Sequence, residues 1–263
     1  MRLQLLAFPA QKPYLISIVL SLFAVAARAE EYSTREVELY AADGYRITGT
    51  HYFIPDRSGP ALFLLHMLGG KHADWDSFLP ILEKAGIKSI FAVDLRGHGG
   101  SNIRKPVGGK SDSVSNVNWR DFTEDDFKDV VNDLDVAWDF LKKSSSTDTT
   151  RMGVMGASIG ANYAAIFASD HPDVKSLALL SPGVIYRGVE FLEAVERYGA
   201  RPVLFAASRE DEYSANSCKK LKEISAGTPA HLEILKGSAH GTYLIENNPG
   251  FKHFLSDWFR STL

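Results

Sequence analysis

The sequence Gly-Ala-Ser-Ile-Gly at positions 156–160 lies between an apolar run at 152–157 and a run of small residues at 161–168. The first run predicts a buried strand and the second a helix. Gly-x-Ser-x-Gly at a strand-to-helix junction is the pattern of a nucleophile elbow, a turn so tight that its flanking residues must be small. Such a turn exposes the serine hydroxyl at the positive end of a helix, where a developing anion is favoured. We therefore ask whether other reactive residues accompany Ser158, since an ordinary turn serine gives the same pattern.

The first 29 residues have the pattern of a secretory signal peptide. Arg2 and Lys12 supply positive charge, residues 14–25 are apolar, and Ala-Arg-Ala ending at position 29 is a small-x-small cleavage site. The apolar stretch is shorter than the roughly 20 residues that a membrane-spanning helix needs. We expect export to a periplasm or out of the cell, with cleavage that leaves a domain of residues 30–263 and no stable membrane anchor.

Charge and cysteine content exclude several classes of protein. The formal net charge of −3 argues against nucleic-acid binding, which needs a basic face. The chain has one cysteine, Cys218, so no internal disulfide can form. No Cys/His group has the spacing of metal ligands. We expect neither a metal nor a cofactor, and the sequence does not indicate an oligomeric state.

Predicted strands and helices alternate along the domain. A hairpin with an Asp43-Gly44 turn is expected at 37–54, and buried strands at 61–66, 87–95, 152–157, 177–180, 203–207 and 232–235. Helices are expected at 77–85, 159–168, 215–224 and 251–259, and polar loops at 97–118 and 144–150. A further helix is expected to be capped by Thr123 and Asp126, with an apolar face at 127–141. This alternation predicts an α/β fold, a mostly parallel twisted sheet of about eight strands with helices on both faces.

Three reactive residues follow predicted strands in a particular order. Ser158 is followed by Asp211, after the strand at 203–207, and then by His240, after the last strand. Since the carboxyl ends of parallel strands share one edge of a sheet, these side chains can meet there. A histidine can accept the serine proton and return it to a leaving group, while a carboxylate orients the histidine. Glu210 and Glu212 flank Asp211, so a shift of one residue would change the acid, and the residues alone leave this choice open.

With these motifs, the chain resembles the α/β-hydrolase superfamily. The resemblance extends to His66-Met67-Leu68-Gly69-Gly70, similar to the loop that ends the third strand, and to the Asp-x-Arg-Gly-x-Gly-x-Ser type segment at 94–101. It implies an oxyanion hole formed by the backbone N–H groups of Leu68 and Ile159. Members of the superfamily often have glycine where this chain has Met67, so Met67 is the alternative donor or a residue that lines the pocket.

The resemblance also implies a lid between the strands that end near 180 and start at 203. Residues 183–201 make a short lid, expected to contain one or two short helices. Its apolar residues are expected to line a pocket for small or medium acyl groups: Val184, Ile185 and Phe191. The loop at 97–118 is expected to form a second wall. Glu190 and Glu193 are candidate ligands for a substrate amine, or residues of a solvated helix face.

The compact plan resembles dienelactone-hydrolase-like and serine-aminopeptidase-like members of the superfamily. We expect an exported serine carboxylesterase that acts on small-molecule esters through an acyl-enzyme. A peptidase or an acyltransferase would use the same triad, and these remain alternatives. A binding protein on a hydrolase scaffold is the alternative from another class, because a fold does not fix a function.

Overall fold

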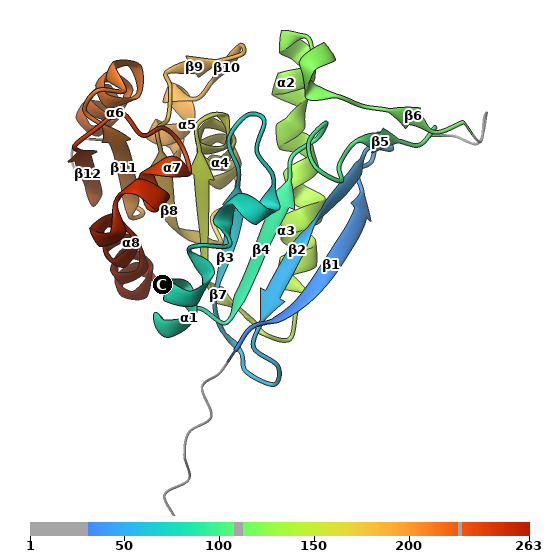
Figure 1. Cartoon of the computed structure of the whole chain (residues 1–263), viewed down its shortest axis with the longest axis horizontal. Coiled ribbons are helices and arrows are strands. Elements are labelled where there is room, and N and C mark those ends of the chain that lie inside the picture. The colour runs from blue at the N-terminus through green and yellow to red at the C-terminus, as the bar shows by residue number, and fades with distance from the viewer. Residues whose placement is uncertain (1–30, 108–112, 226–227) are drawn as a thin grey trace, which may run out of the picture.

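The computed structural model describes residues 31–107, 113–225 and 228–263, so the predicted signal peptide lies outside the described residues. An eight-stranded sheet forms the centre of the molecule, in the order β1-β2-β4-β3-β7-β8-β11-β12 (Figure 1). The pairs β1–β2 and β2–β4 are antiparallel, and the remaining neighbours are parallel. The predicted α/β-hydrolase fold, with its mostly parallel sheet, is confirmed.

The strands of this sheet are β1 (Ser33–Tyr40), β2 (Arg46–Phe53), β3 (Gly59–Leu65), β4 (Ser89–Asp94), β7 (Thr147–Ala157), β8 (Val174–Leu180), β11 (Val203–Ser208) and β12 (Ala230–Leu235). The helices are α1 (Leu79–Lys84), α2 (Glu124–Asp129), α3 (Leu134–Lys142), α4 (Ile159–Asp170), α5 (Leu192–Tyr198), α6 (Glu212–Ile224), α7 (Tyr243–Asn247) and α8 (Pro249–Thr262). Three short 3₁₀ turns lie at His72–Trp75, Trp119–Asp121 and Val130–Asp133.

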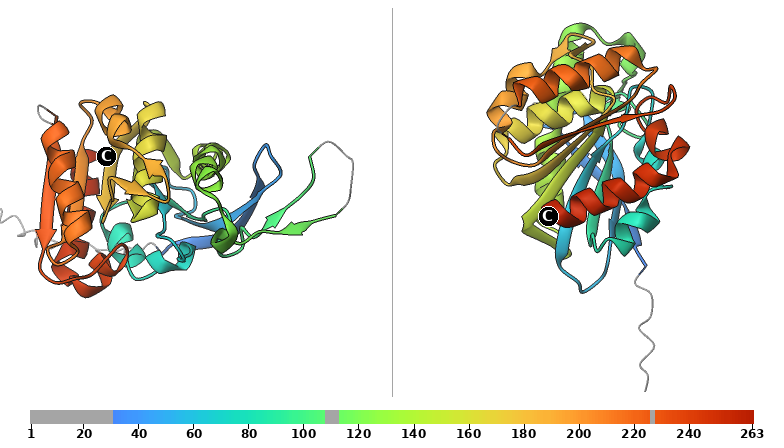
Figure 2. Two further views of the ribbon diagram at one scale, coloured as in Figure 1. Left: turned by 90° about the horizontal axis from the view of Figure 1, so that it is seen from above. Right: turned by 90° about the vertical axis from the view of Figure 1, so that its left-hand side faces the viewer.

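Helices cover both faces of the sheet, as the views from above and from the side in Figure 2 show. Alternate residues of β3 point to opposite sides: Phe63 belongs to the core under α3 and α4, whereas Leu62 and Leu64 belong to the core under α1 and α8. All three side chains are fully buried. A strand buried on both faces has a nearly continuous apolar sequence, which is why the strands could be predicted.

Two predicted boundaries were wrong. The polar residues 147–150 belong to β7: Thr147 is buried and pairs with Gly59, and residues 149 and 150 are exposed, so polar side chains are tolerated there. The helix predicted at 127–141 is split by the 3₁₀ turn Val130–Asp133. That turn places Asp133 in the core, where its carboxylate accepts two hydrogen bonds from the Arg96 guanidinium.

The lid contains one short helix, within the one or two expected, and a hairpin that was not predicted. Its first half is a hairpin of β9 (Ile185–Tyr186) and β10 (Val189–Glu190), and only its second half is helical, as α5. The predicted loop at 97–118 contains a second small hairpin, of β5 (Ile103–Arg104) and β6 (Ser115–Asn116). This hairpin extends away from the body of the molecule (Figures 1 and 2).

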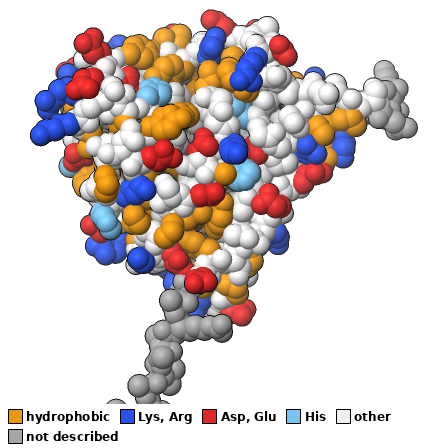
Figure 3. All heavy atoms as spheres, in the orientation of Figure 1, with side chains coloured by type: hydrophobic (Ala, Val, Ile, Leu, Met, Phe, Trp, Pro, Cys, Tyr) orange, Lys and Arg blue, Asp and Glu red, His pale blue; other side chains and the backbone are white. Residues whose placement is uncertain are grey.

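On the face drawn in Figure 3, the acidic and basic side chains of the described residues are interspersed, with no large region of one sign. Within the part of the chain that the structure describes, no helix is both long and apolar enough to cross a bilayer.

Candidate active site

The turn around Ser158 is fixed by the lack of side chains on its neighbours. A Cβ atom on Gly156 would lie 2.1 Å from the Gly160 carbonyl oxygen, and one on Gly160 would lie 2.4 Å from the His66 carbonyl oxygen. Ser158 itself has φ 55° and ψ −123°, a region that residues with a side chain rarely adopt. Its N–H donates to the Leu180 carbonyl at 2.8 Å, which ties the turn to β8. This strained, close-packed turn is the elbow that the pentapeptide predicts.

Two loops at the carboxyl ends of β11 and β12 supply the acid and the histidine. Asp211 is the N-cap residue of α6, but its side chain makes no capping bond. The loops are held together by the N–H of Glu210, which donates to the Gly237 carbonyl at 3.1 Å. The histidine loop is also tied to the end of β8, because the Gly241 N–H donates to Ser181 Oγ at 3.0 Å.

The structure brings Ser158, Asp211 and His240 into one hydrogen-bonded chain. His240 Nδ1 lies 2.7 Å from Asp211 Oδ2, and His240 Nε2 lies 2.8 Å from Ser158 Oγ. Asp211, rather than either flanking glutamate, contacts the histidine. Ser158 is 7% exposed, whereas the His240 side chain is 37% exposed and can reach a bound substrate.

The two backbone amides named from the sequence both border this serine. The N–H groups of Leu68 and Ile159 have no hydrogen-bond acceptor within the described residues, and both residues line the pocket at Ser158. Met67 does not have a positive φ; Gly69 takes the left-handed conformation in this loop, with φ 78°. Methionine is therefore tolerated at the position where glycine is common. Its side chain packs against the histidine loop, since a Cβ atom on Gly241 would lie 2.7 Å from Met67 Sδ.

A pocket of about 340 Å³ opens in front of Ser158. Its walls are Met67, Leu68, Ser158, Ile159, Ile185, Tyr186, Arg187 and His240. Ile185 and Met67 are at the predicted positions. Val184 and Phe191 do not line this pocket: the Val184 N–H is bound to Ser217 Oγ, and Phe191 is buried in the core. Nor does the loop at 97–118 form a wall, because its described residues lie elsewhere.

Comparison with known proteins decides the family. The family model described as serine aminopeptidase, S33, matches residues 58–206, more than half of the chain. The chain belongs to this family. It is therefore a member of the α/β-hydrolase superfamily, and the match supports its assignment as a hydrolase. No curated protein matches the sequence at a significant level.

Solved structures share the fold at low sequence identity. An esterase of Pyrococcus furiosus is 17% identical, with a TM-score of 0.66 over 88% of this chain and 91% of the esterase. A dienelactone hydrolase of Anabaena variabilis is 15% identical, with a TM-score of 0.67 over 89% of this chain and 99% of that enzyme. The α/β hydrolase GrgF of a Penicillium species is 13% identical, with a TM-score of 0.68 over 88% and 99%. At these identities the similarity establishes the fold alone.

Distant residues pin the lid hairpin over the pocket. The buried Asn162 side chain, one turn after Ser158, donates to the carbonyls of Gly183 and Val189, each at 2.9 Å. The Tyr213 hydroxyl donates to the Ile185 carbonyl at 2.7 Å and accepts from the Ile185 N–H at 3.0 Å. Neither Asn162 nor Tyr213 carries a motif in the sequence, so these anchors were not predicted.

Tyr186 is a further pocket residue that was not predicted. Its ring stands edge-on to the His240 ring, with 6.2 Å between centroids. Its hydroxyl lies 3.1 Å from Ser214 Oγ, and burial raises the pKa of this phenol to about 12. The ring therefore stays neutral near the histidine over the physiological pH range.

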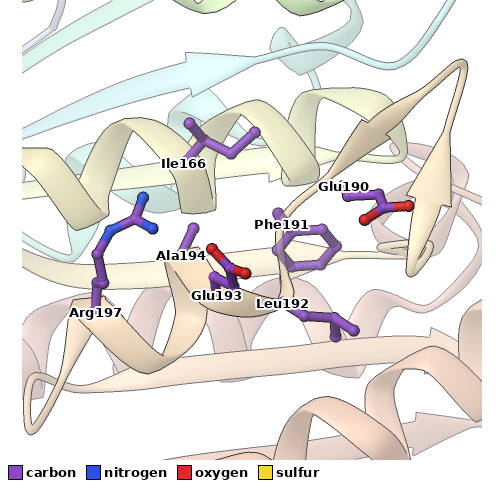
Figure 4. A pocket seen from close by; sticks show the side chains of 7 residues that line it. All are labelled: Ile166, Glu190, Phe191, Leu192, Glu193, Ala194 and Arg197. Atoms are coloured by element: carbon purple, nitrogen blue, oxygen red, sulfur yellow. The ribbon is translucent and has the colours of Figure 1, made fainter.

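Glu190 and Glu193, the candidate amine ligands, lie at a different cavity. This cavity, of about 370 Å³, lies between α4, β10 and α5 (Figure 4). Its walls are Ile166, Glu190, Phe191, Leu192, Glu193, Ala194 and Arg197. It shares no residue with the pocket at Ser158. The two glutamates are therefore not placed to hold the amine of a substrate at Ser158.

Other titratable residues near the site support the loops. Asp94 accepts hydrogen bonds from the N–H groups of His72 and Gly100 and from His72 Nδ1, and these contacts lower the pKa of its carboxyl to about 2 despite burial. His66 Nε2 accepts from the Leu95 N–H at 2.9 Å. Burial lowers the pKa of His66 and of His98 to about 4. These histidines are neutral structural groups.

Cys218 is buried in α6, and burial raises the pKa of its thiol, so it is a poor candidate for a nucleophile. Across 31–107, 113–225 and 228–263, no cluster of three or more His, Cys, Asp or Glu side chains has the arrangement of a metal site.

Proposed function

We propose that this protein is a serine carboxylesterase that cleaves small to medium esters through Ser158, His240 and Asp211. The observation that carries the proposal is the hydrogen-bonded chain of these three residues, with separations of 2.7 and 2.8 Å, at the floor of a pocket. A scaffold retained only for binding has no need of an intact proton relay behind a strained serine. The complete relay therefore favours an enzyme over a binding protein.

The geometry gives each residue a step. Asp211 accepts the Nδ1–H of His240, which leaves the Nε2 lone pair directed at the serine hydroxyl. As Oγ attacks the ester carbonyl, Nε2 takes its proton and the carbonyl becomes an oxyanion. The free N–H groups of Leu68 and Ile159 are placed to stabilise that charge. The imidazolium then protonates the departing alcohol, and water, deprotonated by His240, releases the acid from the acyl-enzyme.

The size of the pocket supports small or medium acyl groups. A volume of about 340 Å³ is at the small end of the range for ligand pockets. Its apolar walls include the side chains of Met67, Leu68 and Ile185. The chemistry proposed here uses only side chains, backbone amides and water, so it requires no cofactor.

The family's description also names aminopeptidases, and that activity is the second candidate. An aminopeptidase needs a carboxylate near the serine to hold the substrate's ammonium group. Among the described residues that line the pocket at Ser158, none is an Asp or a Glu, and Arg187 carries a positive charge. This charge pattern favours an ester over an aminoacyl substrate. An acyltransferase would share the acyl-enzyme and differ only in the acceptor.

A fluorophosphonate probe and a substrate panel test the proposal. The mature protein should be labelled, and the Ser158→Ala variant should not. 4-Nitrophenyl esters of two to eight carbons should be cleaved fastest at the shorter lengths, and aminoacyl 4-nitroanilides much more slowly. Equal labelling of the variant would remove the nucleophile from the proposal, and faster cleavage of the anilides would identify a peptidase instead.

We also propose that the chain is exported, on the signal-peptide pattern of its first 29 residues. Expression of the full chain in a bacterium, followed by N-terminal sequencing of the periplasmic fraction, should give a protein that starts at Glu30. An uncleaved protein that stays in the cytosol would contradict export.

A further inference from the structure

The turn of the lid hairpin carries a residue that the turn itself does not favour. Arg187 and Gly188 are the two residues between β9 and β10, and both have positive φ, 50° and 78°. Positive φ at both central positions is the type I′ pattern, which strongly favours Asn-Gly. Arginine at the first position keeps a strained conformation where asparagine would relax it. An observed strain of this kind calls for a role of the side chain.

The position of Arg187 suggests a role for its side chain in binding the substrate. Arg187 lines the pocket at Ser158, and it is the only Lys or Arg among the described residues that do so. Its guanidinium stands 5.8 Å from the centre of the Phe127 ring. Within the described part of the chain, no Asp or Glu forms an ion pair with Arg187, although the Glu124 carboxylate packs beside Gly188, its neighbour in the turn. A cation that lines an apolar pocket and is not held in an ion pair with a protein carboxylate can pair with an anion on the substrate.

We infer that the substrate is an ester that carries a second, anionic group, such as a carboxylate, which Arg187 binds a few atoms from the scissile carbonyl. This inference rests on the proposed function, whose serine defines the site, and adds the class of substrate. The anion can belong to the acyl chain or to the alcohol, because the guanidinium is at the mouth that both share. Arg187 acts on specificity and has no part in the proton transfers.

Two pairs of substrates test the inference and locate the anion. For the acyl side, the mono-4-nitrophenyl ester of adipic acid is compared with the same ester bearing a primary amide in place of the carboxylate. For the alcohol side, 3-(4-butyryloxyphenyl)propionate is compared with its primary amide. In at least one pair, kcat/KM should be about fivefold to tenfold higher for the anion, mainly through KM. Raising the salt concentration should reduce the ratio.

The decisive variant is Arg187→Asn, which removes the charge and creates the favoured Asn-Gly turn. It should fold at least as well as the wild type and bring the ratio of the anionic to the neutral ester to about one. Arg187→Lys should keep part of the preference. Arg197→Asn is the matched control, because Arg197 is a lid cation that lines the other cavity (Figure 4). That variant should leave the ratio unchanged.

The outcomes separate this inference from the proposed function. Cleavage of the neutral esters that depends on Ser158, with no preference for the anions, would overturn the inference alone. A ratio that Arg187→Asn leaves unchanged would do the same. If no ester is cleaved, the proposed function fails, but calorimetry can still test whether Arg187 binds the anionic group. The Ser158→Ala protein should bind the anionic ester more tightly than the matched ester that bears a primary amide. Adding Arg187→Asn should abolish this difference in affinity. Equal binding there would overturn the inference.

Discussion

The elbow and the lid hairpin both border the pocket, and both contain a non-glycine residue with positive φ, Ser158 and Arg187. At the elbow, Cβ atoms on Gly156 and Gly160 would lie within 2.4 Å of backbone oxygens, so almost no other sequence fits. The hairpin turn is exposed, and its conformation depends on distant side chains such as Asn162. The conformation of the elbow is therefore encoded locally by steric necessity, whereas the shape of the pocket depends on tertiary contacts.

The largest effect is expected for the relay that serves the elbow. Asp211→Asn should lower kcat by about 10⁴, because an amide can hold the histidine in the wrong tautomer. Steady-state assays on a 4-nitrophenyl ester measure this loss. Glu210→Gln is the matched control, since Glu210 is exposed and contacts the histidine loop through its backbone. A larger loss of kcat in the Glu210 variant would identify Glu210 as the acid and contradict the role proposed for Asp211.

The steric account of the elbow predicts a large loss of stability from one methyl group. Gly160→Ala should lower the free energy of unfolding by about 2–4 kcal/mol, because its Cβ would meet the His66 and Leu65 carbonyls. Gly250→Ala, at a helical position with nothing within 4 Å, should be neutral or stabilising by up to about 1 kcal/mol. Urea denaturation measures both. Equal stabilities of the two variants would contradict the account.

Substitutions in the lid should change the substrate specificity and leave the stability of the protein nearly unchanged. Ile185→Ala removes an apolar wall and should change the preference between short and longer acyl chains by about tenfold or more, since each methylene contact is worth about 1–3 kcal/mol. The side chain is 43% exposed, so the melting temperature should change little. Val184→Ala, outside the pocket, should leave the chain-length profile unchanged. If Val184→Ala changed the chain-length profile and Ile185→Ala did not, the acyl chain would bind on the other side of the hairpin.

A smaller and more gradual effect is expected from the buried histidines behind the elbow. The pKa of His98 is lowered to about 4 by burial and by His66, so the folded protein binds fewer protons than the unfolded chain between pH 6.5 and 4. The stability that comes from keeping His98 neutral is therefore lost as the pH falls through this window. His98→Phe, which keeps a ring against Trp119, should lose less free energy of unfolding between pH 7 and 5 than the wild type. Parallel pH profiles of the two proteins would contradict this assignment.

Part of the site was predictable because the reactive residues follow strands. The positions of Ser158 and His240 follow from the strand that precedes each loop, and the sheet brings these loops to one edge. Asp211 was selected over Glu210 and Glu212 by the resemblance to the superfamily, and the structure distinguishes it from them by its 2.7 Å contact with His240. The loop amides at 68 and 159 were predicted from the resemblance alone. Their freedom from internal hydrogen bonds is a property of the folded backbone.

The alternation of buried strands and helices, the elbow and the order of its partners follow from the amino-acid sequence alone. These features are local, because burial on two faces demands apolar runs and a tight turn demands glycine. The side chains that line the pocket, in contrast, are known only from the folded chain. Phe191 and Val184 were predicted to do so, and Tyr186 and Arg187 do so instead. A hairpin of two-residue strands is too short to show a hydrophobic period, which is why the lid hairpin was not predicted. Its orientation over the pocket is set by hydrogen bonds from Asn162 and Tyr213, which are distant in sequence.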